Sequence, residues 1–261
     1  MTGLRLSLGQ MDVALGLPDE NFARVREWTA AAAHNGSALV VFTELWSTGY
    51  DLENWRKHAA PLGEGLFAEL ADLAQEFKIG IAGSILEARN GKAYNTLALY
   101  DAGGNMQAVY RKLHLFRLME EEQWLAPGEE AVATEAAWGR TGLAICYDLR
   151  FVELFRLYAL GGAKIALLPA EWPSRRTAHW QTLIRARAIE NQMFVVAVNR
   201  VGTSKGEHFG GRSAVIDPWG EAVVEGGDGP ELLHAEIDLA LADEVRKRIP
   251  VFEDRRSDIY G

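Results

Sequence analysis

The chain has a single cysteine in 261 residues and no long uninterrupted apolar run. One cysteine excludes an internal disulfide, and the lack of a disulfide framework favours a reducing compartment, so we expect a cytoplasmic protein. No apolar run approaches the ~18 residues that a membrane-spanning helix needs, and the first residues lack the basic and apolar regions of a signal peptide. The net charge of −9 argues against a nucleic acid or an anionic membrane as a partner.

Motifs of metal-dependent and nucleotide-dependent enzymes are also missing. The six histidines are scattered along the chain, without an H-E-x-x-H pair and without a pair of cysteines, so no zinc site is indicated. The chain has no Walker loop, and no G-x-G-x-x-G follows its first apolar stretch. The sequence therefore gives no support to a metal, phosphate-nucleotide or dinucleotide cofactor.

Apolar runs typical of strands alternate with amphipathic stretches typical of helices. Strands are expected at residues 4–11, 38–45, 79–86, 95–101, 106–113, 141–146, 163–170, 194–202 and 232–239. Helices are expected at residues 21–36, 65–80, 150–161 and 176–191, and a hairpin turn at 217–220. Both halves follow the order strand, helix, strand, helix and further strands. This order predicts a layered α/β sandwich, and residues 1–261 are expected to form one domain.

Cys146 lies where the apolar run 141–146 meets the polar turn Tyr147–Arg150 and a following amphipathic stretch. That order predicts a buried strand, a tight elbow and a helix, whose N-terminus would stabilise a thiolate. A nucleophile is one interpretation of this cysteine. The other is a small buried hydrophobe, which is the usual role of a free cysteine. Asp148 is expected to cap or shape the elbow.

Two further reactive side chains lie at the ends of apolar strands. Glu44 follows the run 38–43, and Lys112 ends the run 106–111. Charged residues are common at strand ends because these reach solvent, but ligand sites of α/β sheets also gather there. Together the carboxylate, the ammonium and the thiol of Cys146 could carry out nucleophilic catalysis. An ammonium favours the thiolate and a carboxylate accepts its proton, while Lys112 and the backbone N–H of Tyr147 would stabilise an oxyanion. Glu44 would act as acid and then as base around an acyl thioester.

At Glu44, Lys112 and Cys146 the chain resembles the carbon–nitrogen hydrolase (nitrilase) superfamily, whose triad is Glu-Lys-Cys. The resemblance covers essentially the whole length, through FTELWSTGYD, YRKLHLF, GLAICYDLRF, HWQTLIRARAIENQMFVVAVNRVG, GRSAVIDPWGE and RRSDIYG. It implies a four-layer αββα sandwich with an internal pseudo-two-fold β–α repeat, a homodimer or higher homo-oligomer, and no cofactor or metal. It also implies a second active-site glutamate, which best matches Glu121. The neighbouring Glu120 and Glu122 are alternatives, and a solvated acidic turn is the other interpretation.

The branch of the superfamily is indicated by shorter stretches. Tyr147-Asp148 after the cysteine resembles the amidase branches, and PAEWP at 169–173 resembles ω-amidases that act on 2-oxoglutaramate or 2-oxosuccinamate. The resemblance thus implies an amidohydrolase that releases ammonia from a small linear amide. Glu171 stands where the pattern often has asparagine, and it would oppose a dicarboxylate-like substrate unless paired or pointed away. An N-carbamoyl amino-acid hydrolase, another small-amide or nitrile hydrolase, and a non-catalytic binding protein are the alternatives.

Residues near these motifs are candidates for substrate contact. Arg150 offers a guanidinium suited to a carboxylate, or it pins the elbow through an ion pair. Arg175 and Arg176 follow Trp-Pro, where they hold a distal carboxylate or begin a helix in solvent. Trp172 and Tyr50 wall the pocket or belong to the core. Together with Tyr147, these residues complete the predicted site.

Overall fold

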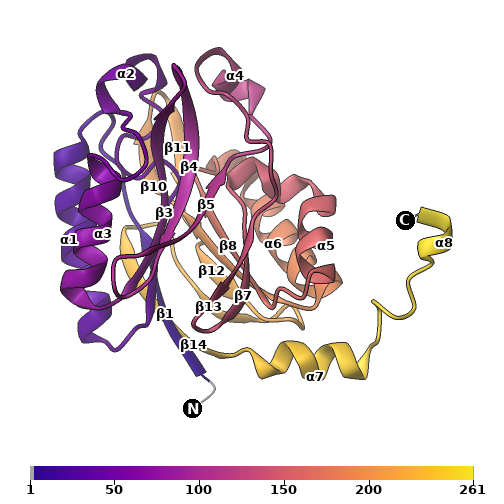
Figure 1. Cartoon of the computed structure of the whole chain (residues 1–261). Coiled ribbons are helices and arrows are strands. Elements are labelled where there is room, and N and C mark those ends of the chain that lie inside the picture. The colour runs from indigo at the N-terminus through magenta and orange to yellow at the C-terminus, as the bar shows by residue number, and fades with distance from the viewer. Residues whose placement is uncertain (1–2, 261) are drawn as a thin grey trace.

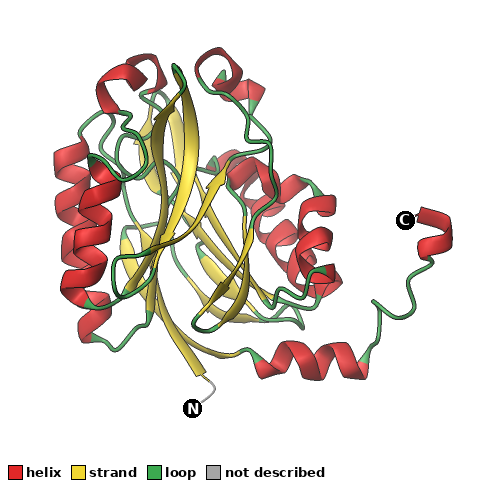
Figure 2. Cartoon of the chain, in the orientation of Figure 1, coloured by secondary structure: helices red, strands yellow, loops and turns green. Residues whose placement is uncertain are grey.

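The computed structural model describes residues 3–260, so Met1, Thr2 and Gly261 of the predicted domain 1–261 lie outside the described residues. Two six-stranded sheets lie face to face between outer layers of helices, which is the predicted four-layer αββα sandwich (Figures 1 and 2). In Figure 1 helices α1 and α3 cover one sheet on the left, and α5 and α6 cover the other on the right.

The first sheet has the strand order β14-β1-β2-β3-β4-β5. Its strands are β1 (Gly3–Gln10), β2 (Leu39–Phe42), β3 (Gly80–Arg89), β4 (Lys92–Tyr100), β5 (Met106–Arg111) and β14 (Glu231–Asp238). The first three are mutually parallel, and the helices between them are α1 (Pro18–His34) and α3 (Leu66–Phe77). Parallel neighbours require long crossover connections, which are usually helices, and this explains the alternation in the sequence.

The second sheet has the order β13-β12-β9-β8-β7-β6. Its strands are β6 (Ala133–Ala136), β7 (Gly139–Leu143), β8 (Ile165–Ala170), β9 (Phe194–Asn199), β12 (Ala214–Ile216) and β13 (Ala222–Glu225). Here β7, β8 and β9 are parallel, and the helices between them are α5 (Val152–Leu160) and α6 (Thr177–Asn191). The predicted hairpin turn at 217–220 joins β12 to β13.

The two sheets repeat one another. Each has three parallel strands joined by two helices, with two antiparallel strands along one edge and one antiparallel strand on the other. In this correspondence β2 matches β8. Glu44, which follows β2, is therefore the counterpart of Glu171, which follows β8. The repeat brings these two carboxylates to the same end of the sandwich.

The main core lies between the sheets, where Leu6, Val41 and Leu97 of the first sheet share a buried cluster with Leu143 and Leu167 of the second. All four residues of β2 are buried because both of its faces are covered, which fits its unbroken apolar run. A second cluster fills the space between the first sheet and its helices. The sheets are thereby fixed against each other, and so are the ends of their strands.

Several elements differ from the sequence expectation. Helix α1 begins at Pro18 rather than residue 21, since proline is well accommodated in a first helical turn. The predicted strand 194–202 is interrupted at Arg200. The sequence did not predict α2 (Trp55–His58), α4 (Glu121–Trp124), the hairpin of β10 (Val201–Ser204) and β11 (Glu207–Gly210), α7 (Ala240–Arg248) or α8 (Ser257–Tyr260). Most of these are short or depend on tertiary contacts.

The C-terminal segment leaves the sandwich. After α7 the chain runs away from the body, and α8 lies apart from the sheets and their helices (Figure 1). Within residues 3–260, no helix combines the length and the apolar character that crossing a membrane requires.

Candidate active site

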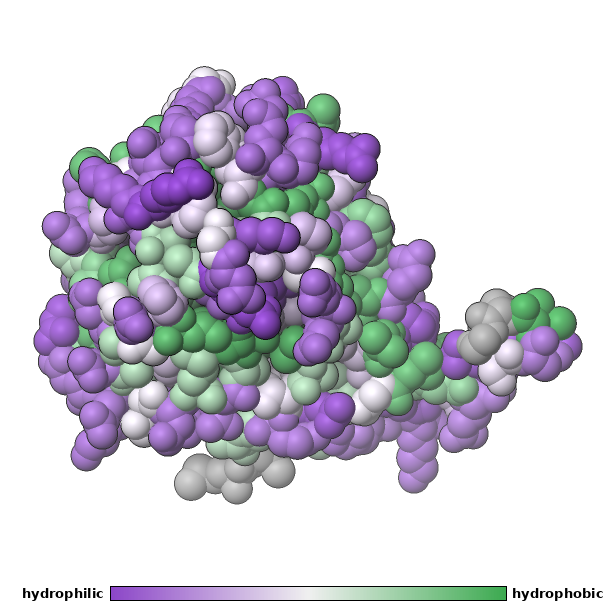
Figure 3. All heavy atoms as spheres, turned by 45° about the horizontal axis from the view of Figure 1, so that its top comes forward, coloured by the Kyte–Doolittle hydropathy of each residue, from purple (hydrophilic) through white to green (hydrophobic). Residues whose placement is uncertain are grey.

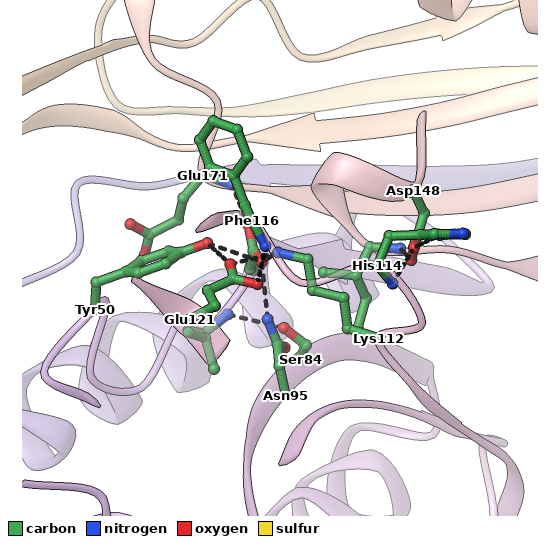
Figure 4. Close-up of polar contacts among 12 residues, drawn as sticks. Tyr50, Ser84, Asn95, Lys112, His114, Phe116, Glu121, Asp148 and Glu171 are labelled. Carbon is green, nitrogen blue, oxygen red and sulfur yellow. Dashed lines mark hydrogen bonds and ion pairs between the residues drawn. The ribbon is translucent and has the colours of Figure 1, made fainter. Parts of the chain in front are cut away.

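Three side chains from separate elements meet in one buried cluster. Glu44 follows β2, Lys112 follows β5, and Glu121 begins α4. The Nζ of Lys112 donates hydrogen bonds to Oε1 of Glu44 at 2.7 Å and to Oε1 of Glu121 at 2.6 Å, and none of the three side chains is exposed. Figure 4 shows Lys112 and Glu121 converging with Tyr50 and Asn95.

Both carboxylate oxygens of Glu44 are held in place. Besides Lys112, Oε1 accepts hydrogen bonds from Asn95 Nδ2 at 2.8 Å and from the Tyr50 hydroxyl at 3.2 Å. Oε2 accepts the backbone N–H of Glu171 at 2.8 Å. Asn95 was not among the predicted site residues. Its role follows only from the pairing of β4 with its neighbours.

The structure brings Glu121, and not its neighbours, into the cluster. Its Oε1 accepts from the Tyr50 hydroxyl at 2.5 Å, and its Oε2 accepts the backbone N–H of Phe116 at 2.9 Å. Glu120 has a left-handed backbone with φ of 57°, which turns the chain so that Glu121 points inward while Glu120 and Glu122 are exposed. The solvated-turn interpretation therefore does not describe Glu121.

Cys146 lies at a sharp turn after β7. Its φ is 47°, in the left-handed region that is unusual for a residue with a side chain. The elbow is present as predicted, and a helix follows it. Cys146–Arg150 form a five-residue 3-10 helix, and α5 begins only at Val152. The helix expected at 150–161 corresponds to α5, and the cysteine lies one 3-10 turn before it.

Asp148 ties the elbow to the segment that carries Lys112. Its Oδ2 accepts the N–H of Ile145 at 2.9 Å and the hydroxyl of Tyr110 at 2.6 Å. Its Oδ1 accepts the N–H of His114 at 3.1 Å and lies 2.7 Å from Nδ1 of the same residue. Tyr110 and His114 flank Lys112 by two positions on either side. Asp148 thus shapes the elbow, as predicted, and also sets its position relative to Lys112.

The charges of the resting site follow from burial and from these contacts. Burial raises the pKa of the Cys146 thiol well above its ordinary value, Glu44 raises it further, and Lys112 opposes the rise without reversing it. Burial by itself would lower the pKa of Lys112, but Glu121 and Glu44 raise it well above its ordinary value. The ammonium of Lys112 thus favours the thiolate, as expected, but burial and the carboxylates outweigh its effect on the pKa of Cys146. Such a thiol needs a base before it can attack.

Glu171 is paired. Its Oε2 accepts a hydrogen bond from Nη1 of Arg200 at 3.0 Å, and both side chains are buried. Burial raises the pKa of Glu171 to about 7, while Arg200 lowers it and Glu44 raises it. Its Oε1 has no hydrogen-bond partner within the described part of the chain. The pairing with Arg200 meets the condition under which an acid is compatible with a dicarboxylate-like substrate.

Cys146 lines a small chamber of about 10 Å³, which it shares with Tyr147, Arg150, Trp172 and four further residues. The guanidinium of Arg150 lies 4.8 Å from the centre of the Trp172 ring. This chamber is little more than the space of one water, so a substrate must displace part of its wall. The structure thus brings three of the predicted substrate contacts to the cysteine.

The two neighbouring arginines have different surroundings. Arg175 is exposed, and its Nη2 lies 3.0 Å from Glu207, so it does not line the chamber. Arg176 does line it, with its guanidinium 5.2 Å from the ring centre of Phe116. The Nη2 of Arg176 is buried and has no hydrogen-bond partner among residues 3–260. Sequence spacing alone did not distinguish these two side chains.

Comparison with known proteins places the chain among close relatives. The model of the carbon–nitrogen hydrolase family matches residues 5–247. The 2-oxoglutaramate amidase of Bacillus subtilis (strain 168) is 40% identical over 256 residues, which cover 98% of both chains. Omega-amidase NIT2 of Homo sapiens is 33% identical over 271 residues, which cover 100% of this chain and 98% of that one.

Solved structures have the same fold. A CN-hydrolase superfamily protein from Xanthomonas campestris, crystallised with an arsenic adduct in its active site, has a TM-score of 0.89 and 33% sequence identity. The match covers 98% of each chain. The similarity therefore extends over both sheets and their covering helices.

Proposed function

The chain belongs to the carbon–nitrogen hydrolase family and is an amidohydrolase of non-peptide carbon–nitrogen bonds, and from this premise we propose that Cys146, Glu44, Lys112 and Glu121 form its active site. One observation carries the proposal. The buried Cys146 interacts with the carboxylate of Glu44, which in turn is bound by the buried ammonium of Lys112 at 2.7 Å. We further propose that the substrate is a small ω-amide with a distal carboxylate.

Acylation begins with proton transfer. Glu44 takes the proton of the Cys146 thiol, and the sulfur attacks the amide carbonyl. The Nζ of Lys112 and the backbone N–H of Tyr147 stabilise the oxyanion that forms. Glu44 then returns the proton to the leaving nitrogen, so the C–N bond breaks, ammonia departs and an acyl thioester remains.

Deacylation uses the same groups. Glu44 deprotonates a water molecule, which attacks the thioester carbonyl, and the acid and the free thiol are released. Glu121 is a positioning residue. It accepts hydrogen bonds from Lys112 Nζ at 2.6 Å and from the Tyr50 hydroxyl at 2.5 Å, and so holds both groups next to Glu44. Because these contacts exist before substrate binds, little reorganisation is needed at the reacting centre.

The surroundings of the cysteine support a substrate with a carboxylate. Arg150 and Arg176 both line its chamber, and Nη2 of Arg176 is buried without a hydrogen-bond partner among the described residues. A guanidinium in that state favours a bidentate anion such as a carboxylate. The names of the relatives, 2-oxoglutaramate amidase and omega-amidase, agree with this class of substrate. We therefore propose 2-oxoglutaramate or 2-oxosuccinamate as the physiological type.

The nucleophile is tested by intact-mass spectrometry during turnover of a panel of ω-amides, N-carbamoyl amino acids and nitriles, with ammonia release measured in parallel. An acyl adduct is expected on the wild-type protein and not on Cys146→Ala. Glu44→Gln should keep the fold, as judged by circular dichroism, and lose turnover. Near-normal activity of Glu44→Gln would contradict the proposed proton path, and no adduct or ammonia with any amide would contradict the enzyme assignment.

The carboxylate site is tested with two adjacent arginines. Arg176→Ala should raise KM for a carboxylate-bearing amide by roughly 10-fold or more, the effect of losing a charged hydrogen bond, and change little with an uncharged amide such as butyramide. Arg175→Ala is the matched control and should behave like the wild type with both. If the two variants are equally impaired with the charged substrate, the clamp is not at Arg176.

Assembly and location are part of the proposal. We propose a homodimer or higher homo-oligomer, supported by exposed apolar side chains on α5 and beyond α7, such as Leu157 and Ile249. The projecting C-terminal segment has the reach to contact a second copy (Figure 1). A free, single cysteine supports the cytoplasm as the compartment. Residues 1–261 are proposed to act as one domain.

A further inference from the structure

A second and larger cavity lies beside the catalytic cluster. It has a volume of about 480 Å³, and Tyr50 and Glu171 form part of its wall. The Tyr50 hydroxyl donates to Glu121 at 2.5 Å and to Glu44 at 3.2 Å, and Glu171 also lines the chamber of Cys146. The cavity is therefore separated by single side chains from the groups that handle the leaving nitrogen.

The charges around this cavity are mostly negative. Four carboxylates and one ammonium line it: Glu53, Glu120, Glu171, Glu207 and Lys205. Three of the carboxylates are ion-paired. Glu120 has no ion-pair partner among the described residues, and so leaves an excess of negative charge. Figure 3, in which this end of the molecule comes forward, shows strongly polar side chains beside apolar ones, and the cavity itself combines both kinds.

Two acceptor atoms of residues on its wall have neither a hydrogen bond nor an ion pair in the described part of the chain; a third, Oε2 of Glu207, has only its ion pair with Arg175. Oε1 of Glu171 and Oγ of Ser204 are both buried, and neither has a hydrogen bond within residues 3–260. Figure 4 shows the Glu171 carboxylate on the Tyr50 side, directed away from Lys112. An unsatisfied buried polar atom is unfavourable, so a ligand with several N–H donors would be stabilised here. An anion would face lone pairs and a negative excess, and is disfavoured.

We propose that this cavity binds the ammonium ion that amide hydrolysis produces, and that it accepts small primary alkylammonium ions in its place. The inference rests on the proposed function for its source of nitrogen. When the C–N bond breaks, Glu44 supplies the proton that makes ammonia, and a proton from solvent then converts ammonia into ammonium. Binding beyond Tyr50 and Glu171 gives the departing nitrogen a place on its way out, and by microscopic reversibility added ammonium returns to the thioester from the same place. The apolar walls formed by Trp124 and Phe209 leave room for a short alkyl group.

Ser204 is a suitable residue to vary. It lies in Gly202-Thr203-Ser204-Lys205-Gly206, which matches G-x-S-x-G by letters, but this stretch is the β10–β11 hairpin and not a strand-to-helix elbow. Ser204→Ala and Glu120→Gln each remove one attraction for a cation without touching the catalytic cluster. Glu69→Gln, on α3, changes the net charge equally and is the control.

The test is exchange of labelled nitrogen. Enzyme, unlabelled amide and ¹⁵NH₄Cl are mixed at constant ionic strength made up with KCl, and ¹⁵N in the remaining amide is measured by mass spectrometry together with hydrolysis. Label enters when ¹⁵NH₃ attacks the thioester: the C–S bond breaks, a C–N bond forms and the sulfur regains a proton. The rate should saturate with ammonium, and Ser204→Ala and Glu120→Gln should raise the half-saturating concentration about 3- to 10-fold. Glu69→Gln should not change it.

Failure of this inference is distinct from failure of the proposed function. The ammonium site would be overturned if amide is hydrolysed but the exchange rate stays linear in ammonium concentration, or has the same ammonium dependence in all variants. Either result would leave the amidase assignment intact. If no amide is hydrolysed, the proposed function fails, and the cavity is tested by the ¹⁵N linewidth of ¹⁵NH₄⁺ alone. The site is supported if the protein broadens the ¹⁵N line and methylammonium reverses the broadening while K⁺ does not. Ser204→Ala should weaken this broadening. No broadening, or equal reversal by K⁺, would contradict it.

Discussion

Replacement of Lys112 by methionine removes the cation that two buried carboxylates share. Lys112 Nζ lies 2.7 Å from Glu44 and 2.6 Å from Glu121, and all three side chains are shielded from solvent. Removing one partner of a buried ion pair costs ~3–5 kcal/mol, because the other charge remains buried. Methionine keeps most of the lysine stem, so packing changes little. We therefore expect Lys112→Met to lower the free energy of unfolding by about 3–5 kcal/mol at alkaline pH, and to abolish turnover.

The loss should depend on pH. Burial already raises the pKa of Glu121, and Lys112 opposes that rise, so the substitution raises the pKa further. A carboxyl whose pKa is higher in the folded than in the unfolded protein contributes stability below its unfolded pKa, and that stability is lost as pH rises through the folded pKa. The deficit of Lys112→Met against wild type should therefore be small near about pH 5 and large near about pH 8.5.

Urea unfolding followed by tryptophan fluorescence measures this deficit at both pH values. A second variant, Lys112→Met with Glu121→Gln, replaces the extra carboxylate by a neutral amide. It should recover part of the lost stability at alkaline pH without recovering activity. An equal deficit for Lys112→Met at both pH values would refute the electrostatic argument, and so would a double variant less stable than the single one.

Three further outcomes are expected. Asp148→Asn should lower the free energy of unfolding by about 2–4 kcal/mol, measured by urea unfolding, and should slow acylation, measured by quenched-flow mass spectrometry. A loss of stability with normal acylation would contradict the positioning role of Asp148. Because the pKa of Cys146 is raised, its alkylation by N-ethylmaleimide should keep accelerating above about pH 9, whereas a plateau near neutrality would show a thiolate. Gly202→Ala places a Cβ against the Asp12 carboxylate at a φ of 89°, and should lower Tm by several degrees more than Gly91→Ala, whose Cβ meets nothing within 4 Å. Equal decreases in Tm for the two variants would show that the Asp12 side chain moves away from the new Cβ at little energetic cost, and would contradict this prediction.

The fold was largely predictable because its signals are local. A buried strand such as β2 is a continuous apolar run, and a covering helix such as α3 repeats its apolar residues at Phe67, Leu70 and Leu73. The hairpin of β10 and β11 and the short helix α4 were missed. Their residues are mostly polar or exposed, and they are held by contacts from segments distant in sequence.

The sequence by itself determined the strand–helix alternation, the elbow at Cys146 and the placement of Glu44 and Lys112 at strand ends, because each depends on neighbouring residues. Only the tertiary structure decided the rest. It selected Glu121 over the glutamates beside it, paired Glu171 with Arg200, and turned Arg176 rather than Arg175 toward the cysteine. These outcomes depend on which side chains meet across the two sheets, and on burial, which sets their charges. Local residue patterns specify neither these contacts nor the burial of the side chains.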